Sequence, residues 1–570
     1  MNFTLNRLRR IRIVLSIALV GTGVGADAGI VSGTVTDTAG AAVAGAMISL
    51  RAADRGITDS VYADADGRYT LTTELSGELS LRIRKRYFRD DARTLVLGAS
   101  AQATADARLS PITDPKELSD DHPALSHFSM IAFDPDESAL FSRANFARDC
   151  LTCHQLGNAF TRWPRNAAGW MPTVQRMHGY LANGDEKPIR QRAEILAAAF
   201  DGKRLASSKP IVPVDPLIYT AKVRQWQLDG TVVPHDAEYA HGNGKMYLSE
   251  MFAGEVIELD LQTGEVLRFK LPDDGLPPGG AFTQVGLPAP YGLTVARAPH
   301  SLVEGHDGKI YLTDSIGAAV TQFDPASRKF ENFQVGNGAL YPHTVRVDAA
   351  GVIWFSISFS EQIGRFDPAT RDMKVIKLPQ APLLSIIGTS VPYGVAVSPR
   401  DGGIWYARLA ADKIGRIDPV TLAVKEYDSP VRAPRRQRFD AVGTLWVAGF
   451  SDGALAKIDV DTWTSTVYPL PIYAPGEIPA PYAVAVHPHT QEIWINDTML
   501  DVAWRFLPNE ERFVAYPMPL RGTYTRDFTF TDAGWACTAN NPIPAPALEG
   551  GVPELICIDP GAQDVSVSAR

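Results

Sequence analysis

The stretch Ile353–Thr370, IWFSISFSEQIGRFDPAT, decides the fold of most of this chain. Its pattern predicts two short strands, the first apolar and built around Trp354, and a turn at Asp367-Pro368 after the second. A Trp or Tyr recurs at the same place in seven segments, with spacings of 41 to 64 residues. The seven aromatic positions are Tyr247, Tyr311, Trp354, Trp405, Trp446, Trp494 and Trp535. Because such a period holds four short strands, we expect a seven-bladed β-propeller over residues 221–562, with these aromatics packed between blades.

The two ends of the propeller segment are expected to share one blade. Val223–Leu228 has the outer-strand pattern that ends other units, so we predict that it completes the blade made by residues 524–560. Cys537 and Cys557 lie on neighbouring strand candidates of that blade. In an exported protein we expect them to form a disulfide, with two free buried thiols as the alternative.

The first 26 residues are typical of an export signal. Arginines at positions 7 to 12 precede the apolar run Ile13–Val20, and small residues follow. We therefore expect cleavage near Ala26 and a periplasmic or secreted protein, with an uncleaved anchor as the alternative. No later segment approaches the roughly 20 apolar residues that span a bilayer, so the mature chain is expected to have no membrane span.

Residues 29–110 have a different composition, with short alternating runs that predict a small β-sandwich. The segments GTVTDTAGAAVAGAMISL (33–50) and ADADGRYTL (63–71) resemble carboxypeptidase regulatory-like domains, and the resemblance implies a spacer or docking module. Residues 111–127, with three prolines, are expected to be a linker. The whole chain of 570 residues has a net charge of -9 and no basic tail, which argues against nucleic-acid binding.

Residues 128–210 are predicted to be a small helical domain, with helices over 142–150, 171–181 and 188–200. This segment contains the motif CxxCH at Cys150, Cys153 and His154. Two thiols at this spacing can add to the two vinyl groups of a haem while the adjacent imidazole reaches the iron. The motif therefore predicts one covalent haem c, with Cys150 and Cys153 as thioethers and His154 as proximal ligand. A disulfide between the two cysteines and half of a zinc site are the alternatives.

The order CxxCH, then WMPTVQRM (170–177), then ILAAAF (195–200) resembles a class I c-type cytochrome domain. The resemblance implies electron transfer and a methionine as the distal iron ligand, for which Met177 is the first candidate and Met171 and His178 are the alternatives. Arg143–Lys209 contains eleven Lys or Arg against five acids. We expect this basic segment to dock on the acidic body of the chain or to attract an acidic periplasmic electron donor or acceptor.

The propeller repeat, with PYGVAVSPRDGGIWYA (392–407) and ADKIGRIDPVT (411–421), resembles the virginiamycin B lyase, or streptogramin lyase, family. Members with that activity open a cyclic depsipeptide by elimination at its ester, with a magnesium ion and a histidine base near the propeller axis. A shared fold is weak evidence for shared chemistry.

One residue near the start of each innermost strand is expected to face the mouth of the central channel. Three histidines on consecutive blades predict acid–base catalysis or a divalent metal site, and Glu250, Asp314 and Asp497 are candidate oxygen ligands. Two arginines at the mouth favour an anionic ligand over a bare cation. A structural hydrogen bond to a neighbouring blade is the alternative for each histidine. The predicted mouth residues are His235, His300, His343, Tyr393, Arg435, Tyr482 and Arg526.

The sequence thus predicts a mainly β, multidomain chain: a β-sandwich, a small helical cytochrome c domain and a seven-bladed propeller. The predicted function is electron transfer by a single haem c, with a propeller that binds a small-molecule substrate or redox partner. If the propeller oxidises that substrate, the protein is a haem-dependent oxidoreductase. The alternatives are a metal-assisted, streptogramin lyase-like enzyme and a propeller that is a non-catalytic interaction platform.

Overall fold

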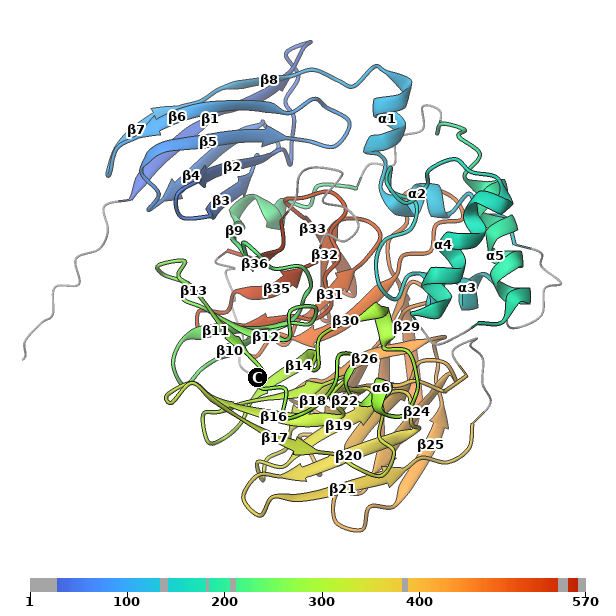
Figure 1. Ribbon diagram of the computed structural model, residues 1–570. Coiled ribbons are helices and arrows are strands. Elements are labelled where there is room, and N and C mark those ends of the chain that lie inside the picture. The colour runs from blue at the N-terminus through green and yellow to red at the C-terminus, as the bar shows by residue number, and fades with distance from the viewer. Residues whose placement is uncertain are drawn as a thin grey trace, which may run out of the picture.

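A computed structural model describes residues 28–133, 142–180, 184–205, 212–381, 388–541 and 552–561. It consists of a β-sandwich, a group of short helices and a β-propeller, all in contact (Figure 1). The expected export signal over residues 1–26 lies outside the described residues. Within the described ranges, no helix has the length and apolar character needed to cross a membrane. The predicted mainly β, multidomain architecture is confirmed.

The sandwich consists of two sheets, as predicted. One sheet has the strand order β4-β1-β7, with β8 also paired to β1, and the other contains β3-β2-β5-β6. Alternating residues such as Val31 and Val35 of β1 are buried in the core between the sheets. The strands are β1 (Gly29–Asp37), β2 (Met47–Ala52), β3 (Ile57–Tyr62), β4 (Arg68–Thr73), β5 (Gly77–Arg84), β6 (Asp91–Leu97), β7 (Gln102–Thr104) and β8 (Ala107–Leu109).

The segment expected to be a linker over residues 111–127 is mostly helical, which the sequence did not predict. Asp114 accepts hydrogen bonds from the backbone N–H groups of Lys116 and Glu117, and this cap starts a helix at Pro115. The helices predicted further along the chain are confirmed, with shifted ends. The helices are α1 (Pro115–Asp121), α2 (Ala124–Phe128), α3 (Arg143–Cys150), α4 (Ala167–Gly179) and α5 (Glu186–Ala199).

The propeller is built from four-stranded antiparallel blades, seven among the described residues. The innermost strands are β10 (Pro234–Ala240), β14 (Pro299–Glu304), β18 (Pro342–Val347), β22 (Pro392–Val397), β26 (Pro434–Phe439), β30 (Pro481–Val486) and β34 (Thr529–Phe530). The second strands are β11 (Lys245–Glu250), β15 (Ile310–Asp314), β19 (Ile353–Ile357), β23 (Ile404–Arg408), β27 (Leu445–Gly449), β31 (Ile493–Asp497) and β35 (Ala536–Asn540). The third strands are β12 (Glu255–Leu259), β16 (Ala319–Asp324), β20 (Gln362–Asp367), β24 (Lys413–Ile417), β28 (Ala454–Asp459), β32 (Val502–Leu507) and β36 (Glu554–Asp559). The outer strands are β13 (Val266–Lys270), β17 (Lys329–Gln334), β21 (Asp372–Lys377), β25 (Val424–Asp428), β29 (Thr464–Pro469), β33 (Arg512–Pro517) and β9 (Lys222–Gln227).

The repeated aromatic and aspartate residues have structural roles in the blades. Trp354 is fully buried, and its indole N–H donates to Asp348 at 2.8 Å. The same carboxylate accepts backbone N–H groups of the turn that precedes β19, so one Asp fixes both the turn and the ring. Trp446 and Asp440 repeat this contact at 3.0 Å. As predicted, these aromatics are core residues.

The closing blade combines the two ends of the propeller segment, as predicted. Strand β9 pairs antiparallel with β36, and the sheet continues through β35 to β34. Cys537 of β35 and Cys557 of β36 form the expected disulfide. This covalent link joins two neighbouring strands at positions that are 20 residues apart in the sequence.

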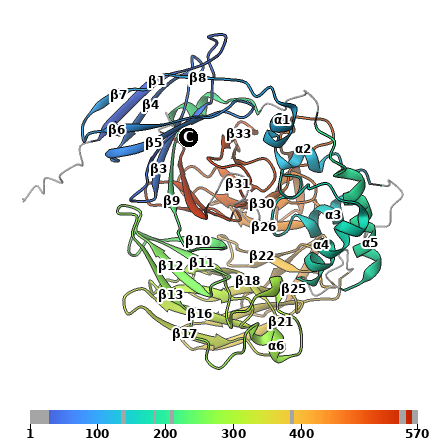
Figure 2. The ribbon, with the colours of Figure 1, turned by 45° about the horizontal axis from the view of Figure 1, so that its top comes forward.

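The closing blade also continues into the sandwich. Strand β9 pairs on its other edge with β3, which makes one eight-stranded sheet across the two domains (Figure 2). Arg224 of β9 donates to both carboxylate oxygens of Asp59 of β3, at 2.6 and 2.9 Å. The sandwich therefore covers an edge that would otherwise present unpaired backbone groups.

Candidate functional site: a cavity between the helices and the propeller mouth

The CxxCH motif lies directly on the mouth of the propeller. Three consecutive backbone carbonyls of the motif accept hydrogen bonds from residues of the inner face of the propeller. Tyr524 donates to Leu151 at 2.5 Å, and Arg526 donates to Cys153 at 3.2 Å. Arg435 donates to the carbonyl and hydroxyl of Thr152, at 3.4 and 2.9 Å. The mouth predicted for a ligand is thus occupied in part by a loop of the chain itself.

Further contacts fix the helical segment in this position. The side chain of Gln155 donates to Asp501 at 2.8 Å and to the backbone carbonyl of Thr523 at 2.9 Å. Phe146 and Trp170 belong to one apolar core together with propeller residues such as Tyr482. Because the two parts share a core, they are expected to move as one body.

A cavity of about 660 Å³ lies between the helical segment and the propeller. Its volume is in the range of small-molecule and cofactor sites. Cys150, Cys153 and His154 line it on one side, and His235, His300 and His343 line it on the other. Apolar and aromatic side chains make up much of the remaining wall: Leu156, Phe160, Trp170, Val174, Leu196, Val233, Met251, Phe252, Tyr291, Tyr341, Phe359, Val391, Tyr393 and Leu409.

The two motif cysteines are free thiols. The disulfide between them, which the sequence left open as an alternative to haem, is therefore not formed. Burial raises the pKa of Cys150 to about 11, which keeps this thiol protonated at neutral pH. His154 lies within 2.7 Å of the carbonyl of Gln155 through Nδ1. A carbonyl only accepts, so Nδ1 carries the proton and Nε2 keeps a free lone pair.

The three candidates for a distal ligand are placed differently. Met177 and His178 line the cavity, and Met171 does not. His178 accepts a hydrogen bond at Nε2 from Arg192, at 3.3 Å, because a guanidinium can only donate. The lone pair of His178 is therefore directed at Arg192 and not into the cavity. Met177 is the remaining cavity-lining candidate for the distal iron ligand.

The three predicted mouth histidines are brought together as a cluster of tilted rings. The ring centroids of His235 and His300 are 3.6 Å apart, and those of His300 and His343 are 4.0 Å apart. Burial lowers the pKa of His235 to about 3, and burial holds the pKa values of His300 and His343 well below the usual range, so all three are neutral at pH 7. His300 Nδ1 is buried without a hydrogen-bond partner within the described residues.

The arginines and tyrosines of the predicted ring are buried, and all of them except Arg435 line the cavity. Arg435 lies in a cage of three rings, with its guanidinium carbon 3.7 Å from the centroid of Tyr482, 4.2 Å from Phe450 and 4.6 Å from Tyr393. Cation–π contacts of this kind favour a desolvated guanidinium. The tyrosine hydroxyls of Tyr393 and Tyr482 hydrogen-bond each other. These residues hold the motif loop.

The acidic residues expected to supply oxygen ligands have other partners. Glu250 is fully buried, accepts backbone N–H groups of Val232, Val233 and Phe252, and does not line the cavity. Asp314 pairs with Arg297 at 2.8 Å, and Asp497 accepts from the backbone of Met499 at 2.7 Å. All three acids stabilise turns at blade ends.

A divalent metal has one candidate group within the part of the chain that is described. The ligand atoms of His235, Asp236 and His300 lie within 4.8 Å of one another. Arg436 donates to both oxygens of Asp236, at 3.1 and 2.7 Å, and so neutralises the only carboxylate of the group. This donor set fits a divalent cation poorly, because its carboxylate already pairs with a guanidinium, whose positive charge repels a cation.

The sequence did not indicate several residues of the cavity. Tyr291 belongs to a long insertion between β13 and β14 that contains α6 (Gly280–Gln284) and η3 (Pro290–Gly292). Its backbone N–H donates to the carbonyl of Tyr180 at 3.3 Å, and its hydroxyl hydrogen-bonds Cys153. The long spacing of 64 residues between Tyr247 and Tyr311 was the signal for this insertion.

Comparison with known proteins identifies two parts of the chain. Residues 288–521 match the virginiamycin B lyase family, and residues 30–110 match the carboxypeptidase regulatory-like domain. Neither match includes the helical segment, and nothing in the comparisons supports a cytochrome c domain there. No curated protein matches the chain.

Among solved structures, a streptogramin B lyase is 18% identical, covering 60% of this chain and 97% of that protein, with a TM-score of 0.48. Virginiamycin B lyase from Staphylococcus aureus is 15% identical, covering 59% of this chain and 99% of that enzyme, with a TM-score of 0.47. A catalytically inactive form of the latter with quinupristin gives the same values. The chain therefore contains a virginiamycin B lyase-like domain and a carboxypeptidase regulatory-like domain.

Proposed function

We propose that this chain is an exported haem c protein that transfers electrons, with the haem held between the helical segment and the propeller mouth. The observation that carries the proposal is the position of CxxCH: both free thiols and His154 line one cavity of about 660 Å³. Covalent attachment occurs outside the cytoplasm, which agrees with the signal predicted over residues 1–26.

The chemistry of the cavity wall supports a haem. Cys150 and Cys153 would form the thioethers, and His154, with Nδ1–H held by the Gln155 carbonyl, offers Nε2 to the iron. Met177, on the cavity wall, is the proposed distal ligand. The bound haem would supply a one-electron centre.

An anionic group is also expected in this cavity. Arg526 is 4% exposed and lines the cavity, and its Nε and Nη1 have no hydrogen-bond partner within the described residues. A buried guanidinium with unpaired N–H groups is costly unless a ligand satisfies it. A haem propionate is such a ligand, and Arg165, also on the wall, is a second cationic donor.

The propeller has two roles in this proposal. It fixes the motif loop through Tyr524, Arg435 and Arg526, and its aromatic residues give the cavity an apolar wall from which a bound haem would displace water. Water exclusion and nearby positive charge both favour the reduced form of an iron centre, so they raise its potential. Phe160 lines the cavity and is 48% exposed, so we place electron exchange with a periplasmic partner at this edge.

The test is covalent haem attachment. The full-length chain, made in cells competent for cytochrome c maturation, is expected to retain haem stain after denaturing electrophoresis. The double variant Cys150→Ser, Cys153→Ser is expected to lose it, whereas Cys537→Ser with Cys557→Ser, the matched control, is expected to keep it. Stain that washes out of the wild type on denaturation, or a colourless protein, contradicts the proposal.

Metal-assisted lyase chemistry is the second candidate function. It is supported by the virginiamycin B lyase match over residues 288–521 and by the clustering of His235, Asp236 and His300. The pairing of Arg436 with Asp236 weighs against it. Magnesium-dependent opening of quinupristin that is lost in His300→Ala supports the lyase. Absence of product, or product formation indifferent to a chelator, removes it.

A further inference from the structure

A second cavity lies at the opposite end of the propeller channel. The innermost strands begin at the helical side, with residues such as His235 and His343, and their later residues line this other cavity. Glu238 of β10, Arg346 of β18 and Arg438 of β26 are on its wall, together with Asp527. It has a volume of about 490 Å³ and shares no lining residue with the first cavity. The two cavities are therefore lined by separate sets of residues.

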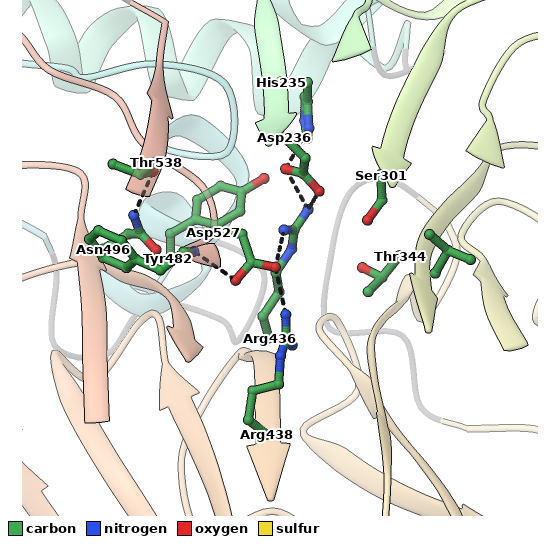
Figure 3. A network of polar contacts seen from close by, with 12 residues as sticks. His235, Asp236, Ser301, Thr344, Arg436, Arg438, Tyr482, Asn496, Asp527 and Thr538 are labelled. Atoms are coloured by element: carbon green, nitrogen blue, oxygen red, sulfur yellow. Dashed lines mark hydrogen bonds and ion pairs between the residues drawn. The ribbon is translucent and has the colours of Figure 1, made fainter. Parts of the chain in front are cut away.

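Three guanidinium groups converge on one carboxylate oxygen beside this cavity. Oδ2 of Asp527 accepts from Arg346 at 2.9 Å, from Arg436 at 2.8 Å and from Arg438 at 2.6 Å. Arg436 also pairs with Asp236, at 2.7 Å, so it lies between the two acids (Figure 3). Three positive charges thus meet two negative charges, and the network has an excess positive charge.

Of the three arginines of the network, Arg346 and Arg438 remain accessible from the cavity. Their side chains are 16% and 18% exposed, whereas that of Arg436 is fully buried. Each donates one bond to Asp527 and one to a neighbouring backbone carbonyl, of Val345 and Gln437 respectively. A guanidinium has five N–H donors, so each arginine keeps donors for a ligand.

Glu238, the next acid on the wall, does not cancel this charge at neutral pH. The pKa of Glu238 is raised to about 8, chiefly by burial and also by Asp527, against the backbone hydrogen bond from Glu304 and the charges of Arg438 and His241, which lower it. The other charged or titratable groups on this wall are Arg346, Asp236, Asp532 and His489, and Glu304 donates its backbone N–H to Glu238. Glu238 is therefore mostly protonated at pH 7 and adds little negative charge to the wall.

The rest of the wall is mainly apolar. Leu302, Val303, Phe439, Val486, Phe528 and Phe530 line it. A pair of guanidiniums at one end of an apolar cavity suits a ligand with one charged group on an apolar body. We propose that this cavity is a binding site for a small organic carboxylate with an apolar or aromatic body, held by Arg346 and Arg438.

The first test is calorimetric titration of the full-length protein at pH 7 with 4-phenylbutyrate and with its neutral amide. We expect the carboxylate to bind at least ten times more tightly than the amide. Arg438→Gln and Arg346→Gln are each expected to lower the affinity for 4-phenylbutyrate at least tenfold. Arg328→Gln, at an exposed position, is the control and is expected to leave this affinity unchanged. Equal affinity for acid and amide, no binding of either in the millimolar range, or binding unchanged in both variants overturns the proposal.

The second test uses pH and guards against a variant that misfolds. As Glu238 ionises above about pH 8, a negative charge appears beside the ligand, so wild-type affinity is expected to fall from pH 7 to pH 9. Glu238→Gln, which mimics the protonated acid, is expected to bind as the wild type at pH 7 and to keep that affinity at pH 9. A wild-type affinity that rises with pH, or an identical fall in both proteins, contradicts the assigned geometry.

Discussion

Tyr524 and Arg435 illustrate how single side chains close the mouth of the propeller. Each donates to a backbone carbonyl of the motif loop, and each is fully buried. The sequence predicted that Arg435 faces the mouth, and in the structure it lies on the innermost strand β26. What it binds there, a loop from residues 151–153, was not predictable, because nothing local to position 435 encodes a partner nearly 300 residues away.

Tyr524→Phe is expected to loosen the motif loop. The substitution leaves the buried carbonyl of Leu151 without its donor, which costs about 1–3 kcal/mol. Hydrogen exchange of residues 142–156, followed by mass spectrometry, is expected to accelerate. Tyr468→Phe is the matched control, since that hydroxyl bonds Glu511 at the exposed outer strand. Unchanged exchange in Tyr524→Phe means that the other contacts hold the loop alone.

His178 makes stability depend on pH. Burial, together with Arg192, lowers the pKa of His178 from 6.5 to about 4. The unfolded chain takes up a proton below pH 6.5 and the folded chain does not, so stability present at pH 7 is lost as pH falls toward 4. The loss from this group is roughly 2–3 kcal/mol.

In His178→Gln, the free energy of unfolding is expected to depend less steeply on pH between pH 7 and pH 4.5. The reason is that the amide keeps an acceptor for Arg192 and does not titrate. Urea unfolding at several pH values measures this slope. His489→Gln, on the surface, is the control. A slope identical to that of the wild type would assign the acid sensitivity to other groups, such as His127, whose pKa burial lowers to about 4.

At the level of elements, the closing blade shows what a repeat can and cannot specify. The pattern of Val223–Leu228 was enough to place β9 beside β36. The same pattern gave no sign that β9 also pairs with β3, because the outer edge of a strand looks alike whether it faces water or another strand. The helices of the expected linker were missed for a similar reason: α1 depends on a single cap, Asp114, in a proline-rich stretch.

Cys537→Ser with Cys557→Ser is expected to destabilise the propeller by about 3 kcal/mol, because the disulfide closes a loop across a sequence separation of 20 residues. Chemical unfolding of the variant and of the wild type, each with and without reductant, measures the difference. The reduced wild type is expected to match the variant. If reduction has no effect on the wild type, the blade is held without the disulfide.

For the whole molecule, the shared sheet between β3 and β9 predicts that the sandwich stabilises the closed propeller. Asp59→Asn removes the carboxylate that accepts both Arg224 donors, at a cost of about 1.5–3 kcal/mol. Calorimetric melting is expected at a lower temperature, with faster proteolysis near residues 110–114. The exposed Asp66→Asn is the control. Equal melting of both variants would show that backbone pairing alone joins the domains.

Two features of this protein followed from its sequence alone. The aromatic repeat predicted the propeller and its closure. The spacing of Cys150, Cys153 and His154 predicted the two thiols and the imidazole that a covalently bound haem requires. Both are patterns within short stretches, where side-chain periodicity or spacing is sufficient.

Only the tertiary structure decided that these two features meet. The motif loop lies on the propeller mouth because residues far apart in the chain share one core and donate to its carbonyls. Likewise, only folding brought Arg346, Arg436 and Arg438 onto the single carboxylate of Asp527. Such convergence depends on packing between segments that are distant in the sequence, and a local pattern of residues does not predict that packing.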